Sequence, residues 1–140
     1  MDAFDADVLI YAAAAGHALG SRVRALFPPD PVEPAEPPAG IGSVMLLPEL
    51  LIKPLREGAT EELEELGALL GRLDLRPADE TTAELAAVLG ASHRLRAADA
   101  IHLATAVAAG ADRFITNNTT DFPKSISEID VTYPQDLPSP

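Results

Sequence analysis

The chain has 140 residues, the length of a single domain with enough apolar material for a core of its own. Apolar residues make up 47% and aromatic residues 4%, which argues against disorder and predicts a core built mainly from Ala, Leu, Val and Ile. The net charge of −12, from 22 acids against 10 bases, excludes broad non-specific binding to nucleic acid, so any contact with phosphate must be local.

Cysteine is absent from the sequence, which excludes disulfides and thiolate metal sites and makes a reducing cytoplasm the expected compartment. The N-terminus is acidic where a signal peptide would be basic, and no apolar run reaches transmembrane length. We therefore expect a cytoplasmic protein that makes no contact with a membrane.

The first apolar run, residues 3–10, predicts the end of a buried strand of a parallel sheet, with Asp5 and Asp7 at alternate positions. Residues 16–27 follow with helical spacing. The segment 28–40 then holds six prolines, three acids and no base, so we expect an exposed loop there.

Residues 41–52 return to the core, as a short strand that turns into a helix near Ser43 and is limited by Pro54. Glu49 lies inside this apolar segment, with Met45-Leu46-Leu47 before it and Leu50-Leu51-Ile52 after it. Such flanks make Glu49 hard to explain as a solvated surface residue.

The middle of the chain predicts a helix, a short strand and a second helix. Thr60 is suited to cap a helix that runs to about Arg72. Three glutamates in the first turn of this helix would interact favourably with the positive end of its dipole. Residues 73–76 predict the strand, and residues 79–89 predict the second helix.

The last third of the chain predicts a helix over residues 99–109, opened by Asp99 as a candidate N-cap and ended by Gly110. Residues 112–116 predict a strand that leads into a polar turn, residues 117–121. A final short strand at 129–132 is followed by a Pro-rich tail, residues 134–140, which we expect to be poorly ordered.

This alternation of strands and helices predicts one domain over residues 1–133, an α/β fold of three layers (α/β/α) with a mainly parallel central sheet. Sites in such sheets form beyond the carboxyl ends of the strands. Asp5, Asp7 and the 117–121 turn are all predicted to lie near such ends, so we expect them to converge.

Asp5, Glu49 and Asp99 all lie in apolar surroundings, where an unpaired carboxylate is costly. Two carboxylates about 4 Å apart repel by roughly 4 kcal/mol at an effective dielectric near 20, so a convergent group calls for a cation. Carboxylate oxygens without cysteine or paired histidines favour Mg²⁺ or Mn²⁺ over Zn²⁺. Read separately, Asp5 also suits the cap of a turn.

Four segments in order resemble the PIN-domain nucleases, and especially the toxin subunits of VapBC toxin–antitoxin pairs. They are Phe4-Asp5-Ala6-Asp7-Val8-Leu9-Ile10-Tyr11, the stretch from Ser43 to Glu49-Leu50-Leu51, Leu95-Arg96-Ala97-Ala98-Asp99-Ala100-Ile101-His102-Leu103-Ala104-Thr105-Ala106, and Gly110-Ala111-Asp112 through Phe114-Ile115-Thr116-Asn117-Asn118 to Asp121-Phe122-Pro123. The resemblance spans nearly the whole domain and implies a PIN-like fold.

The resemblance further implies that Asp5, Glu49, Asp99 and Asp121 surround one or two Mg²⁺ or Mn²⁺ ions and are the catalytic residues. The family commonly has Asn or Ser where this chain has Asp7, which either adds a ligand or braces the loop. Many relatives have an acid at the position of Asn118. The fourth oxygen therefore comes from Asp121, from the Asn118 carbonyl or from water.

The implied activity is hydrolysis of RNA that leaves a 5′-phosphate and a 3′-hydroxyl. Thr116, Asn117 and Arg96 are candidate contacts for this substrate, and Thr116 and Asn117 are also expected to shape the last turn. The implied partners are an antitoxin, which we expect to place a basic inhibitory segment against the carboxylates, and a second copy of the chain, for which we expect an apolar helix face over residues 67–70.

Two other functions stay open. A PIN-like domain retained for protein binding would have lost its last acid at Asn118. A haloacid-dehalogenase-like phosphatase would use Asp5 and Asp7 as nucleophile and acid, but it needs Thr or Val in place of Leu9 and a later Lys before an Asp-Asp pair, which the chain lacks. His102 has no partner histidine nearby in sequence and is expected to be packed and hydrogen-bonded.

Overall fold

The computed structural model describes residues 1–28 and 36–140. In these residues, five parallel strands form one sheet in the order β3-β2-β1-β4-β5. The strands are β1 (Asp2–Phe4), β2 (Gly40–Ser43), β3 (Leu73–Arg76), β4 (Arg113–Ile115) and β5 (Asp130–Thr132). The first strand is central, with β2 on one side and β4 on the other, so the connections change direction across the sheet at β1.

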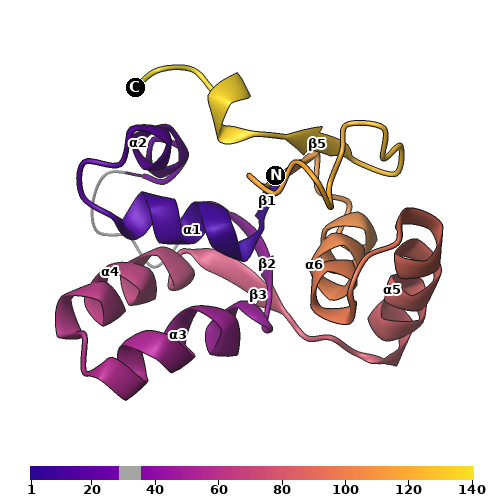
Figure 1. The fold of residues 1–140 in the computed structure, drawn as a ribbon, viewed down its shortest axis with the longest axis horizontal. Coiled ribbons are helices and arrows are strands. Elements are labelled where there is room, and N and C mark those ends of the chain that lie inside the picture. The colour runs from indigo at the N-terminus through magenta and orange to yellow at the C-terminus, as the bar shows by residue number, and fades with distance from the viewer. Residues whose placement is uncertain (29–35) are drawn as a thin grey trace.

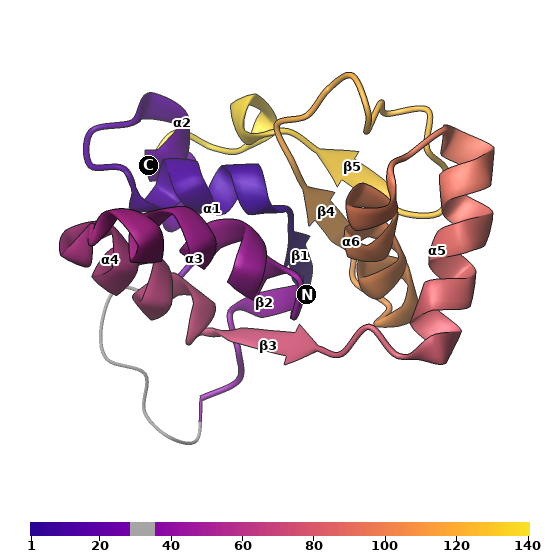
Figure 2. The ribbon, with the colours of Figure 1, turned by 60° about the horizontal axis from the view of Figure 1, so that its bottom comes forward.

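Helices cover both faces of the sheet, as Figures 1 and 2 show. One layer contains α1 (Ala6–Ala13), α2 (Ala18–Arg24), α3 (Leu46–Glu57) and α4 (Thr60–Leu70), and the other contains α5 (Glu80–His93) and α6 (Ala97–Ala108). The predicted three-layer α/β/α fold with a parallel sheet is confirmed.

Alternation along the strands explains the two layers. Ala3 and Phe114 belong to the core packed under α5 and α6, whereas their neighbours Phe4 and Ile115 belong to the core under α1, α3 and α4. Successive side chains of a strand point to opposite faces, so a strand that is apolar at every position requires cover on both.

The chain leaves the first strand earlier than the sequence predicts. The strand expected over residues 3–10 is wrong beyond Phe4, because α1 begins at Ala6. Asp5 caps this helix, since its Oδ1 accepts a hydrogen bond from the Ala6 N–H at 2.9 Å. The buried residues of α1, at positions 8, 9 and 12, follow the helical period.

Pro54 does not end α3, which continues to Glu57 with the proline inside it. The helix stops at Gly58, whose φ of 65° is left-handed and favours glycine. Thr60 is the first residue of α4 and not its cap, because Ala59 occupies the cap position.

The helix that carries Asp99 begins two residues before the predicted start. Arg96 is the N-cap of α6 and provides no side-chain cap, so Asp99 stands in the first helical turn and is not the cap. An acid in the first turn still interacts favourably with the positive end of the helix dipole.

The C-terminal segment packs against the layer of α2. Residues 134–136 form a 3-10 helix (Pro134–Asp136), Leu137 is buried, and the Arg22 guanidinium donates from Nη1 to the carbonyls of Gln135 and Leu137 at 3.1 and 2.9 Å. The expectation of a poorly ordered tail is therefore wrong for residues 134–137, whereas the domain limit at residue 133 stays a prediction.

Two further predictions concern segments at the surface. Residues 36–38 of the predicted loop 28–40 are exposed, and residues 29–35 lie outside the described residues. In the apolar face expected over residues 67–70, Leu69 and Leu70 are buried in the core, and only Gly67 and Ala68 are exposed. No helix in the described part of the chain is long and apolar enough to cross a membrane.

Candidate metal centre

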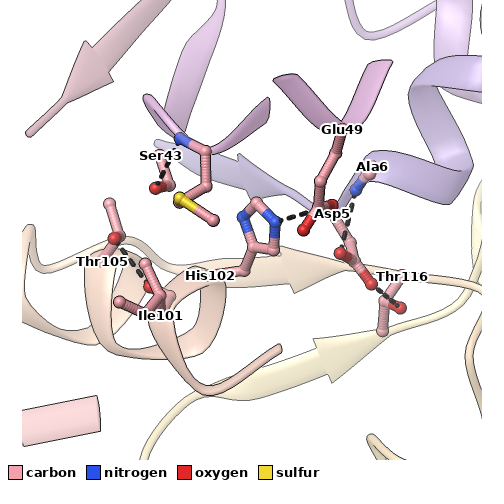
Figure 3. A network of polar contacts seen from close by, with 9 residues as sticks. Asp5, Ala6, Ser43, Glu49, Ile101, His102, Thr105 and Thr116 are labelled. Carbon is pink, nitrogen blue, oxygen red and sulfur yellow. Dashed lines mark hydrogen bonds and ion pairs between the residues drawn. The ribbon is translucent and has the colours of Figure 1, made fainter. Parts of the chain in front are cut away.

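The carboxyl ends of β1 and β4 bring Asp5 and Thr116 together. Phe4 pairs with Ile115 in register, and the Asp5 N–H donates to the Ile115 carbonyl at 2.9 Å. The Thr116 hydroxyl in turn donates to Asp5 Oδ2 at 2.8 Å, as Figure 3 shows. Asp5 is buried, and this burial raises the pKa of its carboxyl above its usual range.

Asp7 is tied to the turn that follows β4. Its Oδ2 accepts the Asn117 N–H at 3.1 Å, whereas its Oδ1 is buried and has no hydrogen-bond partner among the described residues. Burial, followed by the charge of Asp5, raises the pKa of Asp7 to about 7. The bond to the Asn117 N–H is the kind of contact by which Asp7 would brace the loop, and Oδ1 remains available to another partner.

Asp99 and Asp121 approach the same place from α6 and from the last turn. Burial, followed by the charges of Asp5 and Asp121, raises the pKa of Asp99. Asp121 Oδ2 accepts a hydrogen bond from the Asn118 amide at 2.9 Å, and Asn118 Oδ1 accepts the Asp121 N–H at 3.1 Å. The Asn118 side chain is therefore engaged in holding Asp121.

Glu49 reaches the group from α3, on the opposite layer to α6. Its Oε2 lies 3.1 Å from Nε2 of His102, whose side chain is only 1% exposed, against 31% for the side chain of Glu49. Figure 3 shows this pair beside Asp5. The prediction that His102 is packed and hydrogen-bonded is confirmed.

The carboxylates are near enough to influence one another. The charge of Glu49 contributes to the raised pKa of both Asp5 and Asp99, and the charge of Asp99 to that of Asp7. Among residues 1–28 and 36–140, however, no three His, Asp or Glu side chains are already spaced to hold a metal ion.

The donor set nevertheless fits a hard divalent cation. All the convergent acids offer carboxylate oxygens, and the buried Oδ1 of Asp7 lacks a hydrogen-bond partner in the described structure. Mg²⁺ and Mn²⁺ prefer such ligands, and a cation would offset the clustered negative charge. Asp5, Glu49, Asp99 and Asp121, with Asp7 beside them, are therefore the candidate ligands.

The predicted substrate contacts differ in their exposure. Thr116 is fully buried, and its hydroxyl oxygen also accepts the Asn118 N–H at 3.1 Å, which fits the role of shaping the turn. Asn117 is partly exposed, and Arg96 is exposed at the start of α6.

Tyr11 is a residue of this region that the sequence analysis missed. Its hydroxyl accepts the Asn117 side-chain amide at 3.2 Å, and its ring stacks on His17 with centroids 4.4 Å apart. Tyr11 follows Asp7 by one helical turn, so the correct start of α1 would have placed both on one face.

An apolar groove with an acidic wall lies between α1, α2 and α4 and shares no residue with the candidate metal centre. Its volume is about 770 Å³, and its lining consists of Ile10, Ala13, Ala14 and Ala15 near α1, Arg24 of α2, and Glu61, Glu62, Glu64 and Glu65 of α4. The Arg24 guanidinium donates to the carbonyls of Ala12 and Ala14 at 2.8 and 3.3 Å. The four glutamates leave the groove with a net negative charge.

Comparisons with known proteins agree with this architecture. The chain is similar in structure to a toxin–antitoxin complex from Klebsiella pneumoniae, with a TM-score of 0.75, 23% identity, and coverage of 98% of this chain and 100% of that chain. It is also similar to VapBC2 from Rickettsia felis bound to a DNA fragment from their promoter, with a TM-score of 0.68, 16% identity, and coverage of 94% and 97% respectively. At these identities the likeness shows the fold. No curated protein matches the sequence.

The family assignment comes from the sequence itself. The model of the PIN domain matches residues 3–124, which include every candidate ligand from Asp5 to Asp121. This match supersedes the haloacid-dehalogenase alternative. The chain belongs to the PIN domain family.

Proposed function

We propose that this protein is a Mg²⁺- or Mn²⁺-dependent endoribonuclease and the toxin of a VapBC-type toxin–antitoxin pair in the cytoplasm. The observation that carries the proposal is the convergence of Asp5, Glu49, Asp99 and Asp121 at the carboxyl edge of the sheet in a PIN domain. These carboxylates would hold the divalent ion, which would supply activation of water for attack on a phosphodiester and would offset the charge on the leaving oxygen.

The chain's own residues position the ligands and the substrate. Thr116 orients Asp5, Asn118 orients Asp121, and Asp7 fixes the backbone of the turn at Asn117. Asn117 is partly exposed and Arg96 is exposed, and they are the proposed contacts for RNA phosphate. Because the net charge is −12, such local contacts must offset general repulsion of the substrate.

The test is cleavage of a structured RNA by the purified chain in Mg²⁺, with and without EDTA. We expect fragments with 5′-phosphates that are absent in EDTA and in Glu49→Gln. Glu128→Gln is the matched control, because Glu128 pairs with His93 in the same way at a different place on the surface. Cleavage that persists in EDTA, or in Glu49→Gln, would contradict the proposal, and the absence of any cleavage would favour the protein-binding alternative.

The proposed antitoxin carries a basic inhibitory segment. The acidic groove between α1 and α4 offers a docking place for another part of this partner, because an apolar floor with a glutamate wall complements apolar and basic side chains. The inhibitory segment itself is proposed to lie against the carboxylates. The two similar structures are a toxin–antitoxin complex and VapBC2, which also supports an antitoxin partner. We expect the inhibited complex to lose Mn²⁺ binding, and an inhibitor that leaves Mn²⁺ binding intact would contradict a segment placed against the carboxylates.

Homodimerisation is also proposed, but through a face other than residues 67–70. Among the described residues, Ile52 and Leu55 of α3 are large apolar side chains with exposures of 57% and 64%. Their burial against a second copy would remove apolar surface from water. Light scattering should give a dimer that Leu55→Glu disrupts; a wild-type monomer at high concentration would refute the dimer.

A further inference from the structure

His102 is the side chain that joins the two helical layers at the candidate metal centre. It lies on α6 three residues after Asp99, so both belong to one face of that helix. Its Nε2 meets Oε2 of Glu49, which comes from α3 in the other layer. Figure 3 shows the imidazole between α6 and Glu49. Helix α6 therefore carries both the candidate ligand Asp99 and His102, the hydrogen-bond partner of the candidate ligand Glu49.

The His102 imidazole is buried and makes no other hydrogen bond among the described residues. The residue is 2% exposed, and Nδ1 is buried with no hydrogen-bond partner in the described part of the chain. A carboxylate oxygen can only accept, so Nε2 carries the hydrogen of this contact. The ring is held by packing, with a single polar contact to direct it.

Glu49, unlike the buried His102, has a partly exposed and flexible side chain. Its side chain is 31% exposed and has several rotatable bonds, and the bond to His102 is the one side-chain hydrogen bond recorded for it among the described residues. Without that bond, repulsion from Asp5 and Asp99 would favour rotamers that turn the carboxylate outward to water. Bonds that hold a ligating carboxylate are typically worth a factor of about 10 to 100 in metal affinity.

We propose that His102 is a positioning residue that donates from Nε2 to Glu49 and thereby holds this carboxylate toward Asp5 and Asp99 for divalent-metal binding. The inference rests on the metal-dependent function proposed above. It assigns His102 no contact with the metal or with RNA.

The experiment measures Mn²⁺ binding by titration calorimetry, without RNA. His102→Met keeps a side chain of comparable size but loses the donor, and we expect its Kd for Mn²⁺ to rise about tenfold or more. His102→Gln places an amide N–H near the position of Nε2, so its Kd should stay within about threefold of the wild type. His93→Gln is the matched control, since His93 bonds Glu128 at 2.9 Å just before the amino end of β5, whereas the candidate ligands lie at the carboxyl edge of the sheet, and its Kd should not change.

A second measurement needs no folded variant at position 102. Nitrogen chemical shifts of the wild-type His102 ring should show hydrogen on Nε2, and Glu49→Ala should raise the population with hydrogen on Nδ1. Hydrogen on Nδ1 alone in the wild type would overturn the proposal, as would equal Mn²⁺ affinities for the wild type and His102→Met. A wild type that binds no Mn²⁺ would instead overturn the proposed function.

Discussion

Repulsion among the carboxylates predicts that Asp99→Asn stabilises the metal-free protein. Asp99 is partly buried, and its raised pKa arises from burial and then from the charges of Asp5 and Asp121. Two unit charges about 4–8 Å apart repel by roughly 2–4 kcal/mol at an effective dielectric near 20. Partial exposure of Asp99 reduces this repulsion through solvent screening, to about 1–2 kcal/mol.

One opposing effect follows from the position of Asp99 in α6. An acid in the first helical turn gains about 0.3–1 kcal/mol from the helix dipole, which Asn loses. Because Asp99 is not the N-cap, no capping bond is lost as well. The net gain for Asp99→Asn is therefore about 1 kcal/mol, which corresponds to a rise of about 3–5 °C in Tm for a domain of this size.

The assay is thermal unfolding of the wild type and Asp99→Asn, first in EDTA and then in Mg²⁺. The variant should melt higher in EDTA, and the wild type should gain more from Mg²⁺, because a ligand that binds only the native state stabilises it by mass action. RNA cleavage should be lost in the variant. Equal or lower melting of the variant in EDTA, with no response to metal in either protein, would refute the convergence of these charges as a shared cation site.

Three further predictions use other contacts of the same chain. The pKa of Asp7 is raised to about 7 in the folded state, against 3.8 in the unfolded state, so the native state binds more protons between these pH values. The free energy of unfolding of the metal-free protein should therefore increase as the pH falls from 7 toward 4. Asp7→Asn should reduce this dependence on pH in urea titrations, and an unchanged dependence would contradict the prediction. Thr116→Val should lower the free energy of unfolding by about 1–3 kcal/mol at pH 8, because Asp5 loses its buried hydroxyl donor. Denaturant unfolding that matches the wild type would show that this hydrogen bond is unimportant. Arg22→Ala should free the C-terminal segment that it bonds at Gln135 and Leu137, seen as faster tail cleavage in limited proteolysis, whereas unchanged cleavage would mean that the buried Leu137 alone retains it.

Much of the fold follows from the sequence because its signals are local. Apolar runs and capping residues predicted the order of strands and helices, and parallel topology predicted that acids at strand ends would lie at one edge. The errors are local too. The sequence placed Asp5 inside a strand, whereas Asp5 is the N-cap of α1, so the helix begins earlier than predicted. The sequence also ended α3 near Pro54, whereas the helix continues to Glu57 and stops at Gly58.

The partners of the candidate ligands were decided only by the tertiary structure. Glu49 and His102 are 53 residues apart and lie on helices from opposite layers, so nothing local pairs them. The bond of Asp7 to Asn117 spans 110 residues and depends on the register of β1 against β4. By itself the sequence determined which residue types gather at the edge of the sheet. How each carboxylate is oriented, buried and hydrogen-bonded depends on the packing of both helical layers, because those contacts join segments that are distant along the chain.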